Sequence, residues 1–312
     1  MYTFLYCFDN NYNLQAFTSI ISLLDKATKE ISINIIHSSM SDSNDIPKTI
    51  LQHPKLIELK LFKFKKDELV FPNIIGKHIS EATYYRMYFE KYINSSVQKV
   101  IYIDSDIIFL KCPLNDIELK ITELDKSIFT LCAKTEHSMF ANNLQKSKDL
   151  NIESLKYFNA GFMIIDVFKW RKEGTEEKLI KLQDSLLKKI EYWDQDILNS
   201  YFDGKYLELS DSQNYFIDLA LDEINETNSN VDHAMSIHYI GKTKPWSIRG
   251  ILQVNSVYFQ KAYRLLSKNK YLIVNTVRIN SLKILLKSIF SLKILRVDRP
   301  ISFLLYALRS FV

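Results

Sequence analysis

The run from Val100 to Leu110 constrains the fold most, because two acids interrupt an otherwise apolar sequence (VIYIDSDIIFL). A buried strand tolerates charged side chains only where something binds or neutralises them. With the period-two alternation of a strand, Asp104 and Asp106 project to one side and Ser105 to the other, so both carboxylates can reach a single ion. Oxygen ligands suit Mg²⁺ or Mn²⁺, which usually complete their shell with substrate phosphates. The run therefore predicts a metal site for a phosphate ester or anhydride, although an isolated Asp-x-Asp triplet more often just begins a loop.

The composition indicates a globular protein, and the length suits one large α/β domain plus an appendage or two modest domains. The chain has 312 residues, of which 47% are hydrophobic and 13% aromatic, which is enough for a substantial core. It has only six glycines and neither a G-x-G-x-x-G nor a G-x-x-x-x-G-K-[ST] pattern, so a glycine-rich nucleotide-binding turn is not expected. The three cysteines lack metal-ligand spacing, which favours buried thiols in a reducing compartment.

Charge is distributed unevenly along the chain. Residues 261–312 carry eleven basic residues against one acid, a net charge of +10, whereas the preceding 260 residues carry 30 basic and 35 acidic groups. The first residues have no basic n-region and run quickly into Asp9, so a secretory signal is not expected. No apolar stretch is long enough for a transmembrane helix.

Apolar runs alternating with helical patterns predict an open βαβ sheet. The expected strands are residues 2–8, 31–36, 57–64, 97–103 and 127–133. Ligands of such sheets bind beyond the carboxyl ends of the strands. Asp9 and Asn11 follow the first strand and are placed to hold a nucleotide base or ribose, although a turn whose Asx side chains satisfy its own backbone is the simpler interpretation.

Two further polar clusters lie in the middle of the chain. Ser80 is expected to cap a helix over residues 81–92 that carries Arg86 on an aromatic-rich face; this guanidinium makes either a surface salt bridge or a contact to ribose, phosphate or one of the acids. Asn159, Ala160 and Gly161 are expected to form a small-residue bend before a buried strand, where a ligand can approach the backbone.

Two more clusters follow toward the carboxyl end. Asp194, Gln195 and Asp196 open a short helix, as an ordinary cap or as side chains pointing into a catalytic cleft. His238 and Lys244, with Gly241 between them, offer an imidazole, a cation and a flexible backbone for a metal-diphosphate, although a lone histidine in a strand is more often a satisfied core residue.

The order of these motifs resembles the retaining glycosyltransferases of family 8, which include bacterial lipooligosaccharide galactosyltransferases, lipopolysaccharide glucosyltransferases and glycogenin. The resemblance covers roughly the first 250 residues. It is carried by Phe8-Asp9-Asn10-Asn11-Tyr12, His78-Ile79-Ser80, Tyr102-Ile103-Asp104-Ser105-Asp106, Tyr157-Phe158-Asn159-Ala160-Gly161, Asp194-Gln195-Asp196 and the segment from His238 to Trp246.

The resemblance implies a GT-A fold, that is, an α/β domain with a Rossmann-like open mixed sheet flanked by helices, over residues 1–255. It implies transfer of galactose or glucose from a UDP-sugar to a saccharide or glycolipid acceptor. Asp104, Asp106 and His238 would bind Mn²⁺, with Mg²⁺ as the alternative; a nitrogen ligand favours Mn²⁺.

The resemblance also implies residue roles. Asp9 and Asn11 would contact uracil and ribose, and Arg86 would brace the nucleotide or sugar. The remaining donor-binding residues would be Ser105, Asn159, Ala160, Gly161, Asp194, Gln195, Gly241 and Lys244, with Gly241 and Lys244 on the phosphates. The acceptor would meet His78, Ile79 and Trp246.

The catalytic residues implied are Asp194, Gln195 and Asp196. Retention proceeds by double displacement or by front-face attack. Gln195 is a weak nucleophile and Asp196 is expected to lie too far away, so front-face attack is favoured, with the departing phosphate taking the acceptor proton. The sequence departs from the family pattern at Lys134, where relatives often carry an acid.

Residues 256–312 are expected to form a basic, apolar helical region resembling the membrane-attachment region of the bacterial members. Leu282, Leu285, Leu286, Ile289 and Leu292 form an apolar helical stripe, and a second apolar segment follows Arg299-Pro300. Residues 261–312 would bind an anionic inner-leaflet surface, which places the protein in the cytoplasm, peripherally on the cytoplasmic membrane. A helical pair docked on the catalytic domain is the alternative.

Two other functions are compatible with parts of the sequence. In a haloacid-dehalogenase-like phosphatase Asp104 would be phosphorylated and Asp106 would act as acid/base, but that motif normally lies near the start of the chain and precedes a Gly-Thr turn, whereas Ile107-Ile108 follows here. A non-catalytic, membrane-associated nucleotide-sugar binder is the second. Nucleic acid is not an expected partner, because the folded part has no basic and aromatic platform.

Overall fold

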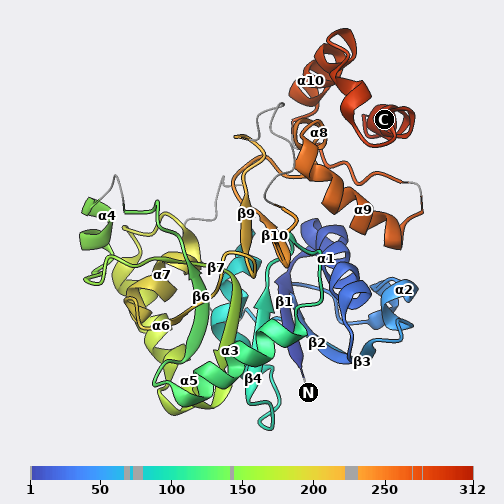
Figure 1. Ribbon diagram of the computed structural model, residues 1–312. Coiled ribbons are helices and arrows are strands. Elements are labelled where there is room, and N and C mark those ends of the chain that lie inside the picture. Colours follow the sequence, from blue (N-terminus) through green and yellow to red (C-terminus); the bar gives the residue numbers. More distant parts are fainter. Residues whose placement is uncertain are drawn as a thin grey trace.

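A central mixed sheet organises the molecule (Figure 1). The computed structural model describes residues 2–66, 71–72, 80–140, 144–221, 231–268, 270–275 and 277–311. Within these ranges, seven strands lie in the order β3-β2-β1-β4-β7-β6-β8. Their bounds are β1 Thr3–Phe8, β2 Ile31–His37, β3 Leu56–Lys63, β4 Lys99–Ile103, β6 Leu131–Thr135, β7 Phe158–Asp166 and β8 Leu207–Glu208.

The strand directions make this an open mixed sheet, as predicted. Strands β3, β2, β1 and β4 are parallel, β7 runs antiparallel to both β4 and β6, and β8 is parallel to β6. Because β1 and β4 are parallel neighbours, their carboxyl ends lie at the same edge of the sheet, and β7 begins at that edge.

Helices cover both faces of the sheet, because alternate strand residues point to opposite sides. Phe4, Tyr6 and Phe8 of β1 pack with apolar residues of α1 and α3, whereas Leu5 and Cys7 pack with η3, α5, α6 and α7. The bounds are α1 Asn13–Lys26, α2 Lys48–Leu51, η3 Glu81–Lys91, α3 Leu114–Lys126, α4 Leu144–Asp149, α5 Val167–Lys172, α6 Thr175–Leu186 and α7 Trp193–Phe202; short 3₁₀ turns lie at Asn10–Tyr12 (η1) and Ser43–Asp45 (η2).

A second sheet of three described strands lies beside the first, in the order β5-β10-β9. Its strands are β5 Ile107–Phe109, β9 Tyr215–Ile217 and β10 Ser236–Tyr239. The expectation that one strand runs through both acids is wrong, because β4 ends at Ile103 and the chain turns at residues 104–106 before entering this sheet. The turn is closed by a hydrogen bond from the amide of Ile107 to the carbonyl of Asp104 at 3.2 Å.

The expected bend at residues 159–161 is also wrong, because these residues lie inside β7. Asn159 pairs with Lys134 of β6, and the carbonyl of Gly161 accepts from the amide of Asp104, which directly follows β4. The predicted helix after Ser80 is confirmed as the 3₁₀ helix η3, and the Ser80 hydroxyl accepts from the Ala82 amide at 3.0 Å. Gly174, with φ +60°, separates α5 from α6.

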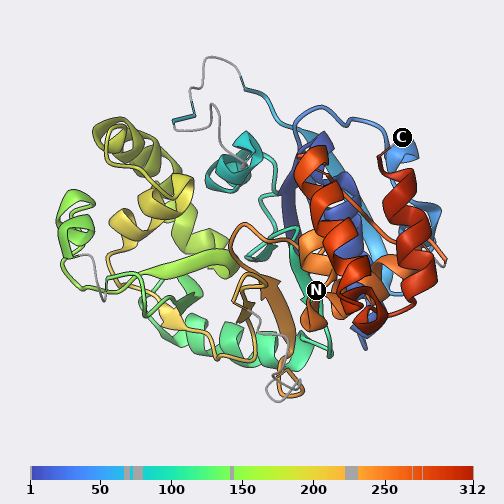
Figure 2. The same ribbon diagram turned by 90° about the horizontal axis from the view of Figure 1, so that it is seen from above.

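The carboxyl-terminal helices lie on the side of the molecule that carries α1 and the strands β1 to β3 (Figure 2). They are α8 Ile248–Ile251, η4 Val254–Ser256, α9 Val257–Leu266, α10 Arg278–Phe290, η5 Lys293–Arg296 and α11 Pro300–Arg309. Helix α9 belongs to the core around β10, through Phe259, whereas α10 and α11 share a separate cluster with α8 through Leu285 and Phe303. In the described ranges, every helix falls short of the length and apolarity needed to cross a membrane. The boundary at residue 255 stays a prediction.

Candidate active site

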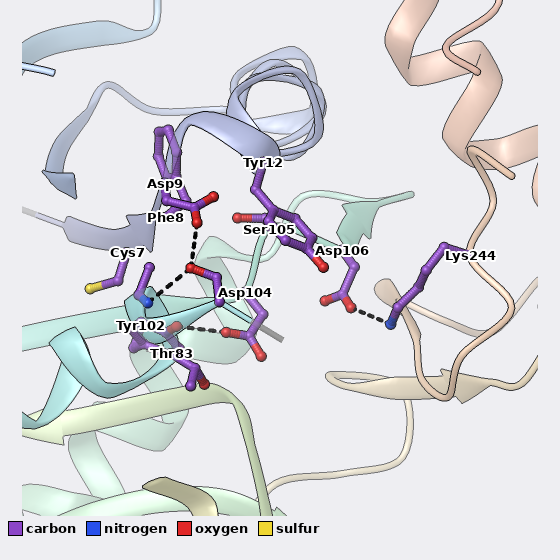
Figure 3. A pocket seen from close by; sticks show the side chains of 12 residues that line it. Cys7, Phe8, Asp9, Tyr12, Thr83, Tyr102, Asp104, Ser105, Asp106 and Lys244 are labelled. Atoms are coloured by element: carbon purple, nitrogen blue, oxygen red, sulfur yellow. Dashed lines mark hydrogen bonds and ion pairs between the residues drawn. The ribbon is translucent and has the colours of Figure 1, made fainter. Parts of the chain in front are cut away.

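The site lies where the carboxyl ends of β1 and β4 meet (Figure 3). Asp9 follows β1 and Asp104 follows β4, and both line one pocket together with Ser105, Asp106 and Lys244. The remaining lining residues are Cys7, Phe8, Tyr12, Ser80, Ala82, Thr83 and Tyr102. The pocket therefore combines three carboxylates and one amine with aromatic walls.

The three predicted metal ligands come together at this pocket. One ligand atom from each of Asp104, Asp106 and His238 lies within 4.8 Å of the others, although His238 is 132 to 134 residues away in sequence. The second sheet causes this meeting, because β10 pairs antiparallel with β5 and sets His238 opposite Ile107.

The ligand atoms have the environment that a divalent cation requires. Oδ1 of Asp106 is buried and receives no hydrogen bond from the described residues, yet it lies 3.2 Å from Nε2 of His238. An unpaired buried carboxylate oxygen is costly unless a cation compensates it. Two carboxylates and one imidazole fit Mn²⁺ by the chemistry of the donors.

Gly161 makes this convergence possible. A Cβ atom on Gly161 would clash with the imidazole of His238 and would lie 2.9 Å from Oδ2 of Asp104. The carbonyl of Gly161 also accepts from the amide of Asp104 at 2.8 Å. The strand β7 thus fits between two of the three ligands only because residue 161 has no side chain.

Lys244 already faces the acids. Its Nζ lies 2.7 Å from Oδ2 of Asp106 and donates to the carbonyl of Tyr239 at 2.6 Å. Burial alone would raise the pKa of Asp106, but the neighbouring positive charge, first that of Lys244, outweighs burial and holds this pKa well below its usual range. Asp106 is therefore an anion throughout the physiological pH range.

Arg86 is buried beneath the site and is fully engaged by protein groups. Its five hydrogen bonds go to Asp194 twice, and once each to Asp104, Ala160 and Thr83. The guanidinium also lies 4.9 Å from the centre of the Tyr102 ring. Arg86 therefore orients Asp104 and Asp194, and the predicted direct contact with the nucleotide or sugar stays a prediction.

The helix α7 presents its three polar residues in different ways. Asp194 is fully buried and pairs with Arg86; burial raises its pKa, and Arg86 and Thr83 only partly offset this. Asp196 is also fully buried and accepts from Tyr157 and from the amides of residues 191 and 192. Gln195 is half-buried, and its Oε1 accepts from the amide of Ala160 at 2.9 Å.

The turn that contains Asp9 and Asn11 satisfies part of its own hydrogen-bonding capacity. Asp9 accepts from the amide of Asn11 at 2.9 Å and from the hydroxyl of Ser80 at 2.6 Å. Asp9 lines the pocket, whereas Asn11 is exposed and is not among the lining residues. The simpler Asx-turn interpretation therefore holds for the backbone, and the contacts with uracil and ribose stay predictions.

The remaining predicted residues surround the site at different depths. Asn159 is buried, Gly241 is exposed with φ +73°, and Ser105 lines the pocket. Trp246 is buried against Phe259, with ring centres 5.1 Å apart, so its packing explains it without an acceptor. His78 and Ile79 lie outside the described residues.

The sequence analysis missed several residues of the site. Tyr102 donates to Oδ1 of Asp104 at 2.6 Å, Thr83 donates to Asp194 at 2.7 Å, and Asn214 contacts the imidazole of His238 at 3.1 Å. Tyr102 belongs to one of the quoted motifs, although no role was predicted for it, and Thr83 lies three residues after Ser80, so both could have been found by proximity. Asn214 lies far from the others in sequence, and no spacing signals it.

The comparisons with known proteins agree with this geometry. A family model described as "Glycosyl transferase family 8" matches residues 3–249. The chain is 28% identical to general stress protein A of Bacillus subtilis over 77% of this chain and 86% of that protein. It is 28% identical to the lipopolysaccharide 1,3-galactosyltransferase of Salmonella typhimurium over 59% of this chain, and the match spans only 55% of that relative.

Solved structures show the same fold. The galactosyltransferase LgtC, solved in complex with donor and acceptor sugar analogs, superposes with a TM-score of 0.71 at 20% identity, covering 85% of this chain and 96% of that one. At this identity the likeness concerns the fold, which is a GT-A fold.

Proposed function

The chain belongs to glycosyltransferase family 8, and from that membership we propose that it transfers galactose or glucose from a UDP-sugar to a saccharide acceptor with retention of configuration. The acceptor we propose is a lipooligosaccharide or another cell-surface glycan. Relatives named as a lipopolysaccharide 1,3-galactosyltransferase and a lipopolysaccharide 1,2-glucosyltransferase support this class of donor and acceptor. Family membership leaves the phosphatase alternative without support.

The observation that carries the proposal is the cluster of Asp104, Asp106 and His238 at the carboxyl edge of the sheet. A site with two carboxylates and an imidazole suits Mn²⁺, and the adjoining pocket has the aromatic and acidic walls that a nucleotide needs. Bound there, the cation would neutralise charge on the departing diphosphate.

Lys244 contributes the second positive charge. Its Nζ lies beside Asp106, and Lys244 lines the pocket, so the ammonium group would be available to a phosphate oxygen bound there. Gly241 contributes a loop in the left-handed region, where a backbone amide can approach the diphosphate closely. These two residues would hold the leaving group while the bond to the anomeric carbon breaks.

Front-face attack is the mechanism that the surroundings of α7 support. A double displacement needs a free carboxylate beside the anomeric carbon. Asp194 is paired with Arg86 and Asp196 with backbone amides and Tyr157, and both are fully buried. The acceptor oxygen would therefore bond on the face from which the diphosphate leaves, and its proton would pass to the departing phosphate.

The first experiment measures UDP release from a panel of UDP-sugars with Mn²⁺, for the wild type and for Asp104→Asn/Asp106→Asn. We expect slow hydrolysis of one donor by the wild type and none by the variant. A matched control is Asp116→Asn, which changes an acid in the first turn of α3, outside the pocket. No turnover of any donor, together with UDP binding that is independent of the metal, would leave only the binding-protein alternative.

The mechanism has its own test. Mass spectrometry of the enzyme quenched during turnover should detect no hexosyl adduct on α7. An adduct on Asp194 or Asp196 would instead establish double displacement.

The proposal includes attachment to the inner face of the cytoplasmic membrane through residues 261–312. The net charge of +10 in this segment supports it, as do the large exposed apolar side chains of α10 and α11. The alternative of a helical pair docked on the catalytic domain accounts for Leu285 and Phe303, which are buried, but not for the exposed residues.

A further inference from the structure

Asn214 lies behind the metal-ligand cluster and has no role in the activity described so far. Its side chain is fully buried. Oδ1 lies 3.1 Å from Nδ1 of His238, and Nδ2 lies 3.3 Å from Oδ1 of Asn159. Oδ1 of Asn159 in turn accepts from the amide of Gly161 at 3.0 Å.

One unambiguous donor fixes the direction of each of these three hydrogen bonds. The Gly161 backbone N–H can only donate, so the Asn159 atom that it meets must be the carbonyl oxygen. That oxygen needs a donor on its other side, so the Asn214 amide must turn its NH₂ group toward Asn159. The Asn214 oxygen then faces His238 as an acceptor.

The chain of hydrogen bonds ends on the imidazole. An acceptor opposite Nδ1 requires the proton to be on Nδ1, which leaves the lone pair on Nε2. Nε2 is the atom that lies 3.2 Å from Oδ1 of Asp106, an oxygen that receives no hydrogen bond from the described residues. Two acceptors that face each other in a buried place are stabilised by a cation between them.

We propose that Asn214 is a positioning residue that fixes the Nδ1–H tautomer of His238 and so presents Nε2 to the divalent cation. Histidine ligands of metals commonly donate their second ring N–H to such a partner. Strand β7, which carries Asn159, also holds Asp104 on the other side of the metal-ligand cluster, because the Gly161 carbonyl accepts from the Asp104 amide at 2.8 Å. One three-residue segment, 159–161, thus aligns both sides of the cluster. The metal part of this inference rests on the proposed function.

The tautomer is tested without metal. Long-range ¹H–¹⁵N spectra of the labelled metal-free protein at pH 8.5, where an unperturbed imidazole is neutral, report which ring nitrogen carries the proton. His238 is assigned by comparison with His238→Ala. We expect the proton on Nδ1 in the wild type and a mixture of tautomers in Asn214→Ala. A proton on Nε2 in the wild type would overturn the inference, even if the variant failed to fold.

Metal affinity provides the second measurement. Titration with Mn²⁺, followed by electron paramagnetic resonance, should show a dissociation constant about 10- to 100-fold higher for Asn214→Ala. Gln260→Ala is the matched control, because Gln260 is also a buried amide, bonded to the carbonyls of Pro245 and Leu272; it should keep the wild-type affinity.

The outcomes separate the two proposals. Equal Mn²⁺ affinity of Asn214→Ala and the wild type would overturn the role of Asn214 alone. Absence of Mn²⁺ binding by the wild type would instead refute the metal site of the proposed function. The tautomer of His238 would then have no metal to serve, whichever ring nitrogen carries the proton.

Discussion

At the scale of single residues, Gly161 is a tight steric constraint on the metal-ligand cluster. Gly161→Ala should lower the stability by about 1–3 kcal/mol, the usual cost of overpacking, because the new methyl group would meet His238 and Asp104. The displaced ligands should also weaken Mn²⁺ binding about tenfold or more. Urea denaturation and Mn²⁺ titration measure the two effects.

Gly174→Ala is the control for this prediction. Gly174 also resists substitution, since its φ is +60°, but a Cβ there meets open space. In Gly174→Ala, backbone strain should lower the free energy of unfolding by about 1–2 kcal/mol, and the Mn²⁺ affinity should stay that of the wild type. Wild-type affinity in Gly161→Ala would show that the ligands tolerate the methyl group.

Lys244 and the metal compete for Asp106. Lys244→Met removes a positive charge whose Nζ lies 2.7 Å from Oδ2 of Asp106, and unit charges about 4 Å apart interact by several kcal/mol near a protein surface. In the absence of a UDP-sugar, we expect Lys244→Met to bind Mn²⁺ at least about threefold more tightly than the wild type. We also expect the variant to release UDP from the UDP-sugar more slowly. The exposed neighbour Lys242 provides the control variant Lys242→Met. Weaker Mn²⁺ binding by Lys244→Met would contradict the competition.

At the scale of elements, the contact between η3 and α6 contains a buried acid whose protonation links pH to stability. Oε1 of Glu176, in the first turn of α6, pairs with Lys91 of η3 at 2.9 Å, whereas Oε2 is buried without a hydrogen bond from the described residues. Burial raises the pKa of Glu176, and Lys91 only partly offsets this. The folded state therefore retains the proton to higher pH than the unfolded chain, so this acid lowers the stability as the pH rises through the raised pKa.

Glu176→Gln tests this contact. The amide resembles the protonated acid in shape, so the two proteins should be about equally stable at pH 4, near the unfolded pKa. The variant should become the more stable one as the pH rises to 7, because the lost pairing with the exposed Lys91 is worth little. Urea denaturation of both proteins from pH 4 to 8 measures the difference. A difference that does not change with pH would refute the assignment to Glu176.

The elements that the sequence predicts best are those with a local signal. The apolar runs of β1 and β4 end at acidic residues, and both strands were predicted, as was the place of Asp9 beyond the carboxyl end of β1. Strand β5 has only three residues, too few for a period, so its membership of a second sheet could not be predicted. The same sheet brings His238 to Asp106, a contact that the family resemblance implied and the residue pattern alone did not.

Some residues of the site have no local signal at all. Asn214 acquires its role from two side chains, those of His238 and Asn159, which are 24 and 55 residues away in sequence. The pairing of Arg86 with Asp194 spans 108 residues. Such contacts arise from tertiary packing, which neither spacing nor propensity encodes.

At the scale of the whole molecule, charge and apolar surface are concentrated at one end. The C-terminal helical unit, residues 277–311, buries one side of α10 and of α11 in an apolar cluster shared with α8 and leaves the other side in solvent. The apolar stripe predicted on α10 is divided in this way: Leu285 is buried, whereas Leu282 and Leu286 are exposed. Exposed apolar side chains among basic residues are the arrangement that binds an anionic lipid surface.

Vesicle binding tests this surface most directly through its two most exposed apolar residues. Phe290 and Ile301 expose 85% and 78% of their surface, so Phe290→Ser/Ile301→Ser should leave the fold and the turnover of donor unchanged. It should reduce co-sedimentation with anionic phospholipid vesicles about tenfold or more, because each large apolar side chain contributes about 1.5–3 kcal/mol when buried.

Wild-type binding should itself weaken with salt, since about 1 kcal/mol per nearby basic residue is electrostatic. Phe168→Ser on α5, which removes a side chain that is 66% exposed, is the control and should bind like the wild type. Equal binding of all three proteins, or binding to zwitterionic vesicles that is equally strong, would assign the exposed helices to a role other than membrane attachment.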